Sequence, residues 1–174
     1  MDEKTVTIFG TSKARSGDAV FELAFELGSV LAQAGYTIVN GGYGGTMLAS
    51  AKGAALAGGK TVGVTCSAFG RGSANEHISR EIVTATLDER LETLIQLGKG
   101  YVVLPGSTGT LLELAKVWEL QNKGFLSPPK PIILLGEFWK PLVNLITSDE
   151  PDSSRCLIMA DGPLQAKEIL AEGV

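Results

Sequence analysis

YVVLPGSTGTLLE, residues 101–113, gives the clearest indication of the fold, because it joins an apolar run to a predicted helix through a polar turn. Residues 101–104 are continuously apolar, which is typical of a strand buried on both faces of a sheet. The turn at 106–110 contains only Gly, Ser and Thr, and apolar residues recur at helical spacing beyond it. A buried strand that passes directly into a helix predicts the repeating unit of a parallel sheet.

The same alternation of β-branched runs and longer amphipathic or Ala- and Leu-rich segments continues in both directions. It predicts strands at 5–9, 36–39, 61–65, 82–85, 101–104, 131–135 and 156–159, and helices at 18–34, 46–56, 87–97, 110–123, 138–146 and 163–171. Right-handed crossovers between such strands give an α/β fold, a Rossmann-like three-layer α/β/α sandwich with a mostly parallel sheet. Because we find no linker or internal repeat, we expect residues 1–174 to form a single Rossmann-like nucleotide-binding domain.

Composition restricts the classes of function. The 174 residues are 44% hydrophobic with a net charge of -4, which favours a globular domain and argues against nucleic acid or an anionic membrane as a partner. Cys66 and Cys156 form no CxxC motif, so we expect no disulfide framework, no metal site and a reducing compartment. We see no signal peptide and no membrane-spanning run, and therefore expect a soluble, cytoplasmic protein.

Three polar or Gly-rich turns, at 10–17, 41–45 and 106–110, follow predicted strands and open predicted helices. Ligands of open parallel sheets bind at this edge, where helix N-termini offer unpaired amides and glycine lets the backbone approach an anion. The turns predict a ligand that bears phosphate. No Asp or Glu occurs between Glu26 and Glu76, which fits either an anion site kept free of carboxylates or a largely buried region.

Two common nucleotide motifs are absent from the sequence. The stretch GGYGGTM does not satisfy GxGxxG, since the last position, counted from Gly42, is Met47. No acidic residue follows at the distance that a dinucleotide site would need, and GxxxxGK[ST] does not occur. The phosphate-binding arrangement is therefore of another kind, and no cofactor is predicted.

Together, FGTS near the start, GGYGGTM, DERLETL and LPGSTGTLLE resemble the LOG ("lonely guy") family of cytokinin riboside 5′-monophosphate phosphoribohydrolases. Some relatives have been labelled lysine decarboxylases, and one branch contains molybdenum-cofactor carrier proteins. The resemblance covers nearly the whole chain. It implies hydrolysis of a nucleoside 5′-monophosphate to free base and ribose 5-phosphate, and a homodimer or higher homo-oligomer, whose interface the apolar helix at 111–120 could supply.

The resemblance also implies site residues. Arg90 matches the family's arginine and Glu113 the glutamate of PGGxGTxxE, so both are expected to be catalytic. The Gly-rich turns are expected to bind the phosphate or nucleotide through Gly10, Thr11, Ser12, Gly41, Gly42, Gly45, Thr46, Met47, Pro105, Gly106, Ser107, Thr108, Gly109 and Thr110. The chain departs from the family in three places: Ser107 replaces a glycine, Leu91 replaces a lysine and Leu112 replaces a carboxylate.

Glu113 has two interpretations. A carboxylate beside the sugar could stabilise an oxocarbenium-like transition state and activate water, with Arg90 holding the phosphate, the sugar or the carboxylate. Alternatively, Thr110 and Glu113 form a T-x-x-E capping box that only starts the helix. The residues alone favour the cap and the resemblance favours catalysis. No general acid is evident, and Asp88 and Glu89 are better explained as solvated helix charges.

Three functions are compatible with the sequence. The first is the hydrolase. The second is a protein that binds or carries a nucleotide or a phosphate-bearing cofactor such as the molybdenum cofactor without turnover, which the departures at Leu91 and Ser107 favour. The third is a single-strand DNA-binding protein, which we rank last because aromatic residues are few and the net charge is negative.

Overall fold

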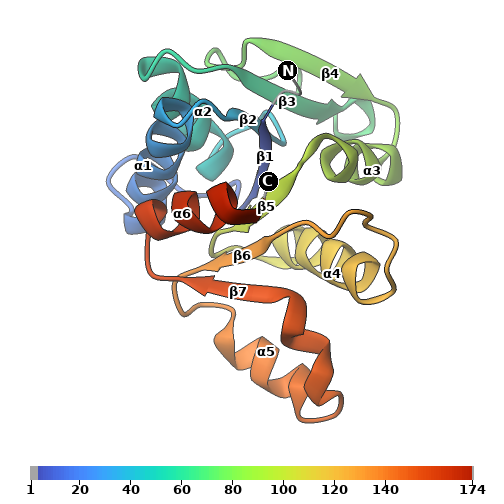
Figure 1. Cartoon of the computed structure of the whole chain (residues 1–174). Helices are drawn as coiled ribbons and strands as arrows, with labels where there is room; N and C mark the ends of the chain where they lie inside the picture. The colour runs from blue at the N-terminus through green and yellow to red at the C-terminus, as the bar shows by residue number, and fades with distance from the viewer. Residues whose placement is uncertain (1–3, 174) are drawn as a thin grey trace.

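A parallel sheet of seven strands, in the order β4-β3-β2-β1-β5-β6-β7, forms the centre of the computed structural model, which describes residues 4–173. Helices cover both faces of the sheet (Figure 1). The strands are β1 (Thr5–Phe9), β2 (Thr37–Asn40), β3 (Thr61–Cys66), β4 (Arg80–Thr84), β5 (Gly100–Val103), β6 (Ile132–Leu135) and β7 (Leu157–Ala160). The helices are α1 (Ala19–Gln33), α2 (Thr46–Leu56), α3 (Leu87–Leu97), α4 (Thr108–Asn122), α5 (Lys140–Thr147) and α6 (Pro163–Gly173), with short 3-10 turns at Ser67–Phe69 and Pro151–Cys156.

The predicted fold class is confirmed, and every predicted strand and helix is present. One predicted boundary was wrong in a way that matters for the site, because helix α4 begins at Thr108, two residues before its predicted start. The stretch after β3, where no helix was predicted, contains a 3-10 turn at Ser67–Phe69.

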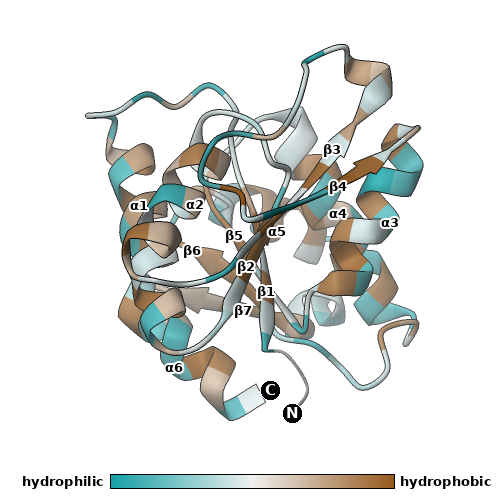
Figure 2. Cartoon of the chain, turned by 90° about the horizontal axis from the view of Figure 1, so that it is seen from above, coloured by the Kyte–Doolittle hydropathy of each residue, from teal (hydrophilic) through white to brown (hydrophobic). Residues whose placement is uncertain are grey.

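Each strand divides its side chains between two hydrophobic cores. In β1, Val6 and Ile8 pack into the core beneath α1, α2 and α6, whereas Phe9 packs into the core beneath α3 and α4. This alternation follows from the two-residue period of a strand, and burial on both faces explains why the strands read as continuous apolar runs. Figure 2 shows that the helices around the sheet carry both hydrophobic and hydrophilic residues, as amphipathic helices do.

The order of the strands creates a crevice beside β1. From β1 the chain builds outward through β2 and β3 to β4, and then returns to place β5 on the other side of β1. The connections after β1 and β5 therefore diverge at the carboxyl edge of the sheet, where open α/β sheets bind their ligands. Within residues 4–173, no helix has the length and apolar character needed to cross a membrane.

Helices α1 and α2 pack unusually closely, because each presents a glycine to the backbone of the other. A methyl group on Gly28 would overlap the carbonyl oxygen of Ser50, and one on Gly53 would overlap that of Phe25. The small residues of α2 thus reflect close helix packing.

We expect Gly28→Ala to lower the free energy of unfolding by about 2 kcal/mol, because overlap with the α2 backbone outweighs the better helix propensity of alanine. Urea denaturation followed by circular dichroism measures the change. Ser29→Ala, which adds no atom toward α2, is the matched control. If the Gly28→Ala protein were as stable as the wild type, α1 and α2 would be able to move apart far enough for the methyl group at no cost in free energy of unfolding.

Candidate functional site

A cleft of about 440 Å³ lies at the carboxyl edge of the sheet, beside β1. It is bounded by the loop after β1, the turn after β2, the 3-10 turn after β3 and the first turns of α3 and α4. Its lining residues are Gly10, Thr11, Ser12, Lys13, Tyr43, Met47, Phe69, Arg71, Leu87, Arg90, Leu91, Ser107, Thr108, Gly109, Thr110, Leu112 and Glu113. The structure thus brings segments from the first and second halves of the chain together.

Two asparagines hold the Gly-rich turn after β2. The fully buried Asn40 accepts a hydrogen bond from the Gly42 amide at 2.8 Å and donates to the Met47 carbonyl at 2.9 Å. Asn75 donates to the carbonyls of Gly42 and Tyr43 at 3.0 and 2.9 Å. Gly42 has a φ of 76°, in the left-handed region that glycine adopts easily. Sequence reasoning missed both asparagines, whose partners become apparent only in the fold.

The first turn of α4 forms one wall of the cleft. The helix begins at Thr108, so the amides of its first residues have no partner within the helix and carry the positive end of the helix dipole. Ser107, at the N-cap, makes no side-chain capping bond and has a φ of −103°, which any residue adopts. The serine that replaces the family's glycine therefore leaves the turn unstrained, and its hydroxyl is available at the cleft.

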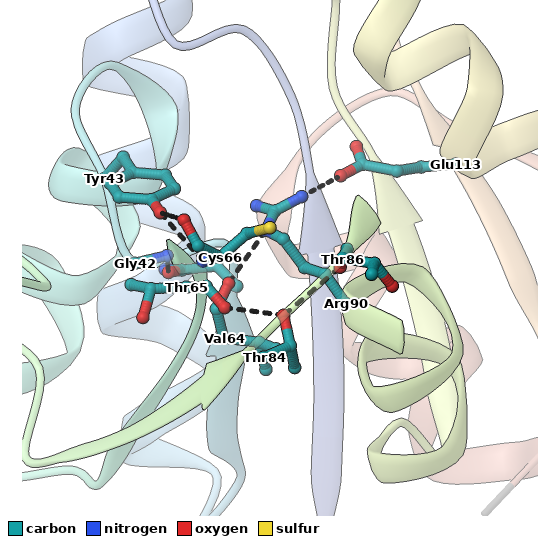
Figure 3. A network of polar contacts seen from close by, with 10 residues as sticks. Gly42, Tyr43, Val64, Thr65, Cys66, Thr84, Thr86, Arg90 and Glu113 are labelled. Atoms are coloured by element: carbon teal, nitrogen blue, oxygen red, sulfur yellow. Dashed lines mark hydrogen bonds and ion pairs between the residues drawn. The ribbon is translucent and has the colours of Figure 1, made fainter. Parts of the chain in front are cut away.

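Arg90 crosses beneath the cleft from α3. Its side chain is only 8% exposed, its Nε donates to the Val64 carbonyl at 2.8 Å, and its Nη1 lies 3.6 Å from Oε1 of Glu113 (Figure 3). A side chain at Gly41 would overlap the Arg90 guanidinium. The glycine at position 41 is therefore explained by the space that the arginine needs.

Glu113 is a carboxyl group in a mostly buried setting. Its side chain is 14% exposed, and burial raises its pKa to about 7, against the opposing effect of the Arg90 charge and hydrogen bond. Near neutral pH the group is therefore divided between its protonated and ionised forms. Such a carboxyl can both accept and donate a proton during one reaction.

The alternative interpretation of Glu113 as a helix cap is wrong. Because α4 begins at Thr108, Thr110 lies inside the helix, and Glu113 lies beyond its first turn and pairs with Arg90. A comparable box occurs instead at α3, where Thr86 accepts a hydrogen bond from the Glu89 amide and the Glu89 carboxylate accepts one from the Ala85 amide. Glu89 therefore stabilises the start of α3 and is not poised as a general acid.

The phosphate-binding residues expected from the sequence fall into two groups. Those that line the cleft are Gly10, Thr11, Ser12, Met47, Ser107, Thr108, Gly109 and Thr110. Those that lie behind its surface are Gly41, Gly42, Gly45, Thr46, Pro105 and Gly106. Thr46, for example, donates both its amide and its hydroxyl to the Thr11 carbonyl, at 2.9 and 3.1 Å, and so fixes the loop after β1. A methyl group on Gly106 would overlap the Thr110 side chain, which explains that glycine by packing.

Seven lining residues were not among the expected site residues, and three of them, Tyr43, Phe69 and Arg71, lie against one another. The Tyr43 hydroxyl accepts a hydrogen bond from the Cys66 amide at 2.8 Å, which ties the turn after β2 to the end of β3. The guanidinium carbon of Arg71 lies 5.5 Å from the Tyr43 ring centroid and 5.6 Å from that of Phe69. An aromatic residue between glycines, in GGYGG, was the one signal that could have indicated Tyr43.

Other polar or reactive residues lie away from the cleft. His77 is near Glu76, with 3.7 Å between Nε2 and Oε1, and Cys66 and Cys156 are unpaired. In the part of the chain that the structure describes, no group of three or more His, Cys, Asp or Glu side chains is arranged to hold a metal ion. Among the residues that line the cleft, Glu113 is the one carboxylate, and Arg90 is its ion-pair partner.

Comparison with known proteins places these features in a family. Residues 3–166 match the family model of the SLOG cluster4 family. Over 119 residues the chain is 37% identical to a cytokinin riboside 5′-monophosphate phosphoribohydrolase of Mycobacterium tuberculosis, and this match covers 67% of the chain but only 62% of that relative. An enzyme of the same name from Mycobacterium marinum is 31% identical over 137 residues, with 78% of the chain and 71% of the relative covered.

Solved structures share the fold over the whole chain. The molybdenum cofactor binding protein of Rippkaea orientalis has a TM-score of 0.81 at 22% identity, covering 99% of this chain and 98% of its own. A molybdenum-cofactor carrier protein of Chlamydomonas has a TM-score of 0.76 at 25% identity, with the same coverage. DNA processing protein A of Helicobacter pylori is more distant, with a TM-score of 0.66 at 16% identity, and covers 97% of this chain and 80% of its own.

The pKa of Glu113 leads to a prediction about stability. Because the pKa is raised from 4.5 to about 7 in the folded protein, the folded state keeps a proton between these pH values that the unfolded chain has released. The contribution of Glu113 to the free energy of unfolding is therefore complete below pH 4.5 and is lost as the pH rises to 7. Glu113→Gln cannot lose a proton, so its free energy of unfolding relative to the wild type should rise by about 3 kcal/mol between pH 4.5 and 8.

Urea denaturation of both proteins across this pH range measures the difference. Glu119→Gln, on the exposed side of the same helix, is the matched control and should show no comparable trend. If the Glu113→Gln difference stayed constant with pH, the carboxyl would not be protonated in the folded protein near neutrality.

Proposed function

Because the chain belongs to the SLOG cluster4 family, we propose that it hydrolyses the N-glycosidic bond of a nucleoside 5′-monophosphate, releasing the free base and ribose 5-phosphate. The observation that carries this proposal is the pairing of Arg90 with Glu113, at 3.6 Å, in a cleft that the N-terminus of α4 also lines. The names of the mycobacterial relatives support the same activity.

The cleft suggests how the substrate is held. We place the 5′-phosphate at the N-terminus of α4, where amides of residues 108–110 and the hydroxyls of Ser107 and Thr108 can donate to its oxygens. Thr11 and Ser12, from the loop after β1, lie at the same cleft and can close the phosphate site from the other side. The sugar then faces Glu113, one helical turn further along α4.

Glu113 supplies the reactive group in this proposal. As the bond between C1′ and the base nitrogen breaks, its electron pair leaves with the base and positive charge develops on the sugar, which an ionised carboxylate stabilises. Water attacks C1′ and gives a proton to Glu113, and that proton is then available to the departing base. Arg90, which cannot release a proton usefully, orients the carboxylate through its own bond to the Val64 carbonyl.

Purified protein should release free base from at least one of AMP, GMP, CMP, UMP and isopentenyl-AMP, as measured by chromatography. Glu113→Gln should lower the rate by a factor on the order of 100 or more, because the amide can neither carry the negative charge nor take the proton. Glu119→Gln, an exposed carboxylate on the same helix, should retain the wild-type rate. A folded wild-type protein that releases no base from any of these nucleotides would exclude the hydrolase.

The rate should also depend on pH through Glu113. Only the ionised carboxylate can stabilise the developing charge, so the rate at saturating substrate should rise with pH, reach half its maximum near pH 7 and then level off. A rate that falls over the same range would show that the protonated form of Glu113 acts instead.

A second candidate function is binding of a phosphate-bearing cofactor without turnover. It is favoured by the apolar side chains of Leu87, Leu91 and Leu112 in the lining of the cleft, because Leu91 and Leu112 replace charged residues expected from the family resemblance. The Chlamydomonas carrier protein, which has a similar fold over 99% of this chain, supports the same possibility. Nucleotide binding by calorimetry without release of base would favour this function over the hydrolase.

We also propose a homodimer that forms through α4 and α5 in the cytoplasm. A groove of about 270 Å³ between these helices is lined mainly by apolar side chains, including Leu111, Trp118 and Ile146, and Leu145 beside it is 66% exposed. Burying such a surface against a second copy would remove apolar area from water. The unpaired thiols of Cys66 and Cys156 are consistent with a reducing compartment.

A further inference from the structure

The cleft continues into a second depression of about 510 Å³. This lobe is lined by Ser12, Lys13, Tyr43, Gly44, Arg71, Ser73 and Asn75, and four of these residues, Ser12, Lys13, Tyr43 and Arg71, also line the cleft. The two spaces are therefore continuous. The lobe lies beside the turns after β2 and β3, on the side away from the N-terminus of α4.

The charged side chains lining the lobe are both cations. Lys13 and Arg71 are exposed, and among residues 4–173 neither has a carboxylate within ion-pair distance. Glu81 shares a neighbouring depression with Arg71, but its carboxylate accepts hydrogen bonds from the Thr65 hydroxyl and the Ala74 amide, at 2.7 and 2.9 Å. The lobe is thus a positively charged space with hydroxyl donors from Ser12 and Ser73.

The guanidinium group of Arg90 lies against the same aromatic rings as that of Arg71. The Arg90 guanidinium carbon lies 5.9 and 5.7 Å from the ring centroids of Tyr43 and Phe69, the same two rings against which Arg71 lies. Two like charges beside one pair of rings repel each other, and an anion between or beside them would relieve this repulsion. Glu113 is the carboxylate that lines the adjoining cleft, and it is partly protonated near neutral pH.

We propose that Lys13 and Arg71 bind a second phosphoryl group of the nucleotide whose first phosphate lies at the N-terminus of α4. This inference rests on the proposed nucleotide site and adds the class of ligand: a nucleotide with two phosphoryl groups. The second group is either attached to the 5′-phosphate, as in ADP, or placed on the other side of the sugar, as in adenosine 3′,5′-bisphosphate. Both sources offer the anionic oxygens that lysine and arginine recognise.

Calorimetry with the Glu113→Gln protein, which avoids turnover, compares AMP, ADP and adenosine 3′,5′-bisphosphate as ligands. At least one of the two ligands with a second phosphoryl group should bind about tenfold more tightly than AMP, the size of effect expected for charge-assisted hydrogen bonds at a partly exposed site. Which of them gains affinity shows where the second group is attached. The gain should shrink as salt is added, because both cations are exposed.

Adding Lys13→Gln and Arg71→Gln to this protein, singly and together, should reduce the affinity ratio toward one. Adding Lys52→Gln and Arg80→Gln, exposed cations outside the lobe, should leave the ratio unchanged. Binding of AMP with no gain from a second phosphoryl group, or a gain that survives the double substitution, would overturn the inference but not the nucleotide site. Absence of binding by all three nucleotides would overturn the inference, and release of no base from any of the five nucleoside monophosphates would overturn the nucleotide site as well.

Discussion

The buried guanidinium of Arg90 is the group on which the rest of the site depends. A charge removed from water is tolerated only when polar partners replace the lost hydration, and Arg90 has the Val64 carbonyl and the Glu113 carboxylate. Its position requires the absence of a side chain at Gly41 and fixes the direction in which Glu113 points. Arg90, on α3, therefore constrains both the turn after β2 and helix α4.

The central position of β1 in the sheet brings the loops of the site together. Because the chain builds outward on one side of β1 and then on the other, the connections after β1, β2 and β5 meet at a single edge. Hydrogen bonds then hold the loops there: Thr46 binds the Thr11 carbonyl, and Asn75 binds the turn after β2. Loops that carry binding groups are precise only when such bonds hold them.

The electrostatics of the cleft follow from burial as much as from charge. Glu113 lies beside an arginine, which favours its ionised form, yet removal from water has the larger effect and brings its pKa to about 7. The N-terminus of α4 and the exposed Lys13 and Arg71 make the rest of the cleft attractive to anions. One cavity thus combines an anion-binding wall with a carboxyl group that titrates near neutral pH.

The parallel α/β fold, the order of its elements and the Gly-rich turns at the edge of the sheet could be predicted from the residues alone, because they follow from local periodicity and turn chemistry. Local pattern misplaced the helix cap, since Thr110 and Glu113 have the spacing of a capping box while the box that forms is at Thr86 and Glu89. The interactions that hold the site join residues distant in sequence: Arg90 pairs with Glu113, and Asn75 binds the turn after β2. The partner of Glu113, the rise in its pKa and the cations that share its cleft could not be predicted in this way, because burial and through-space charge depend on residues that the fold brings together.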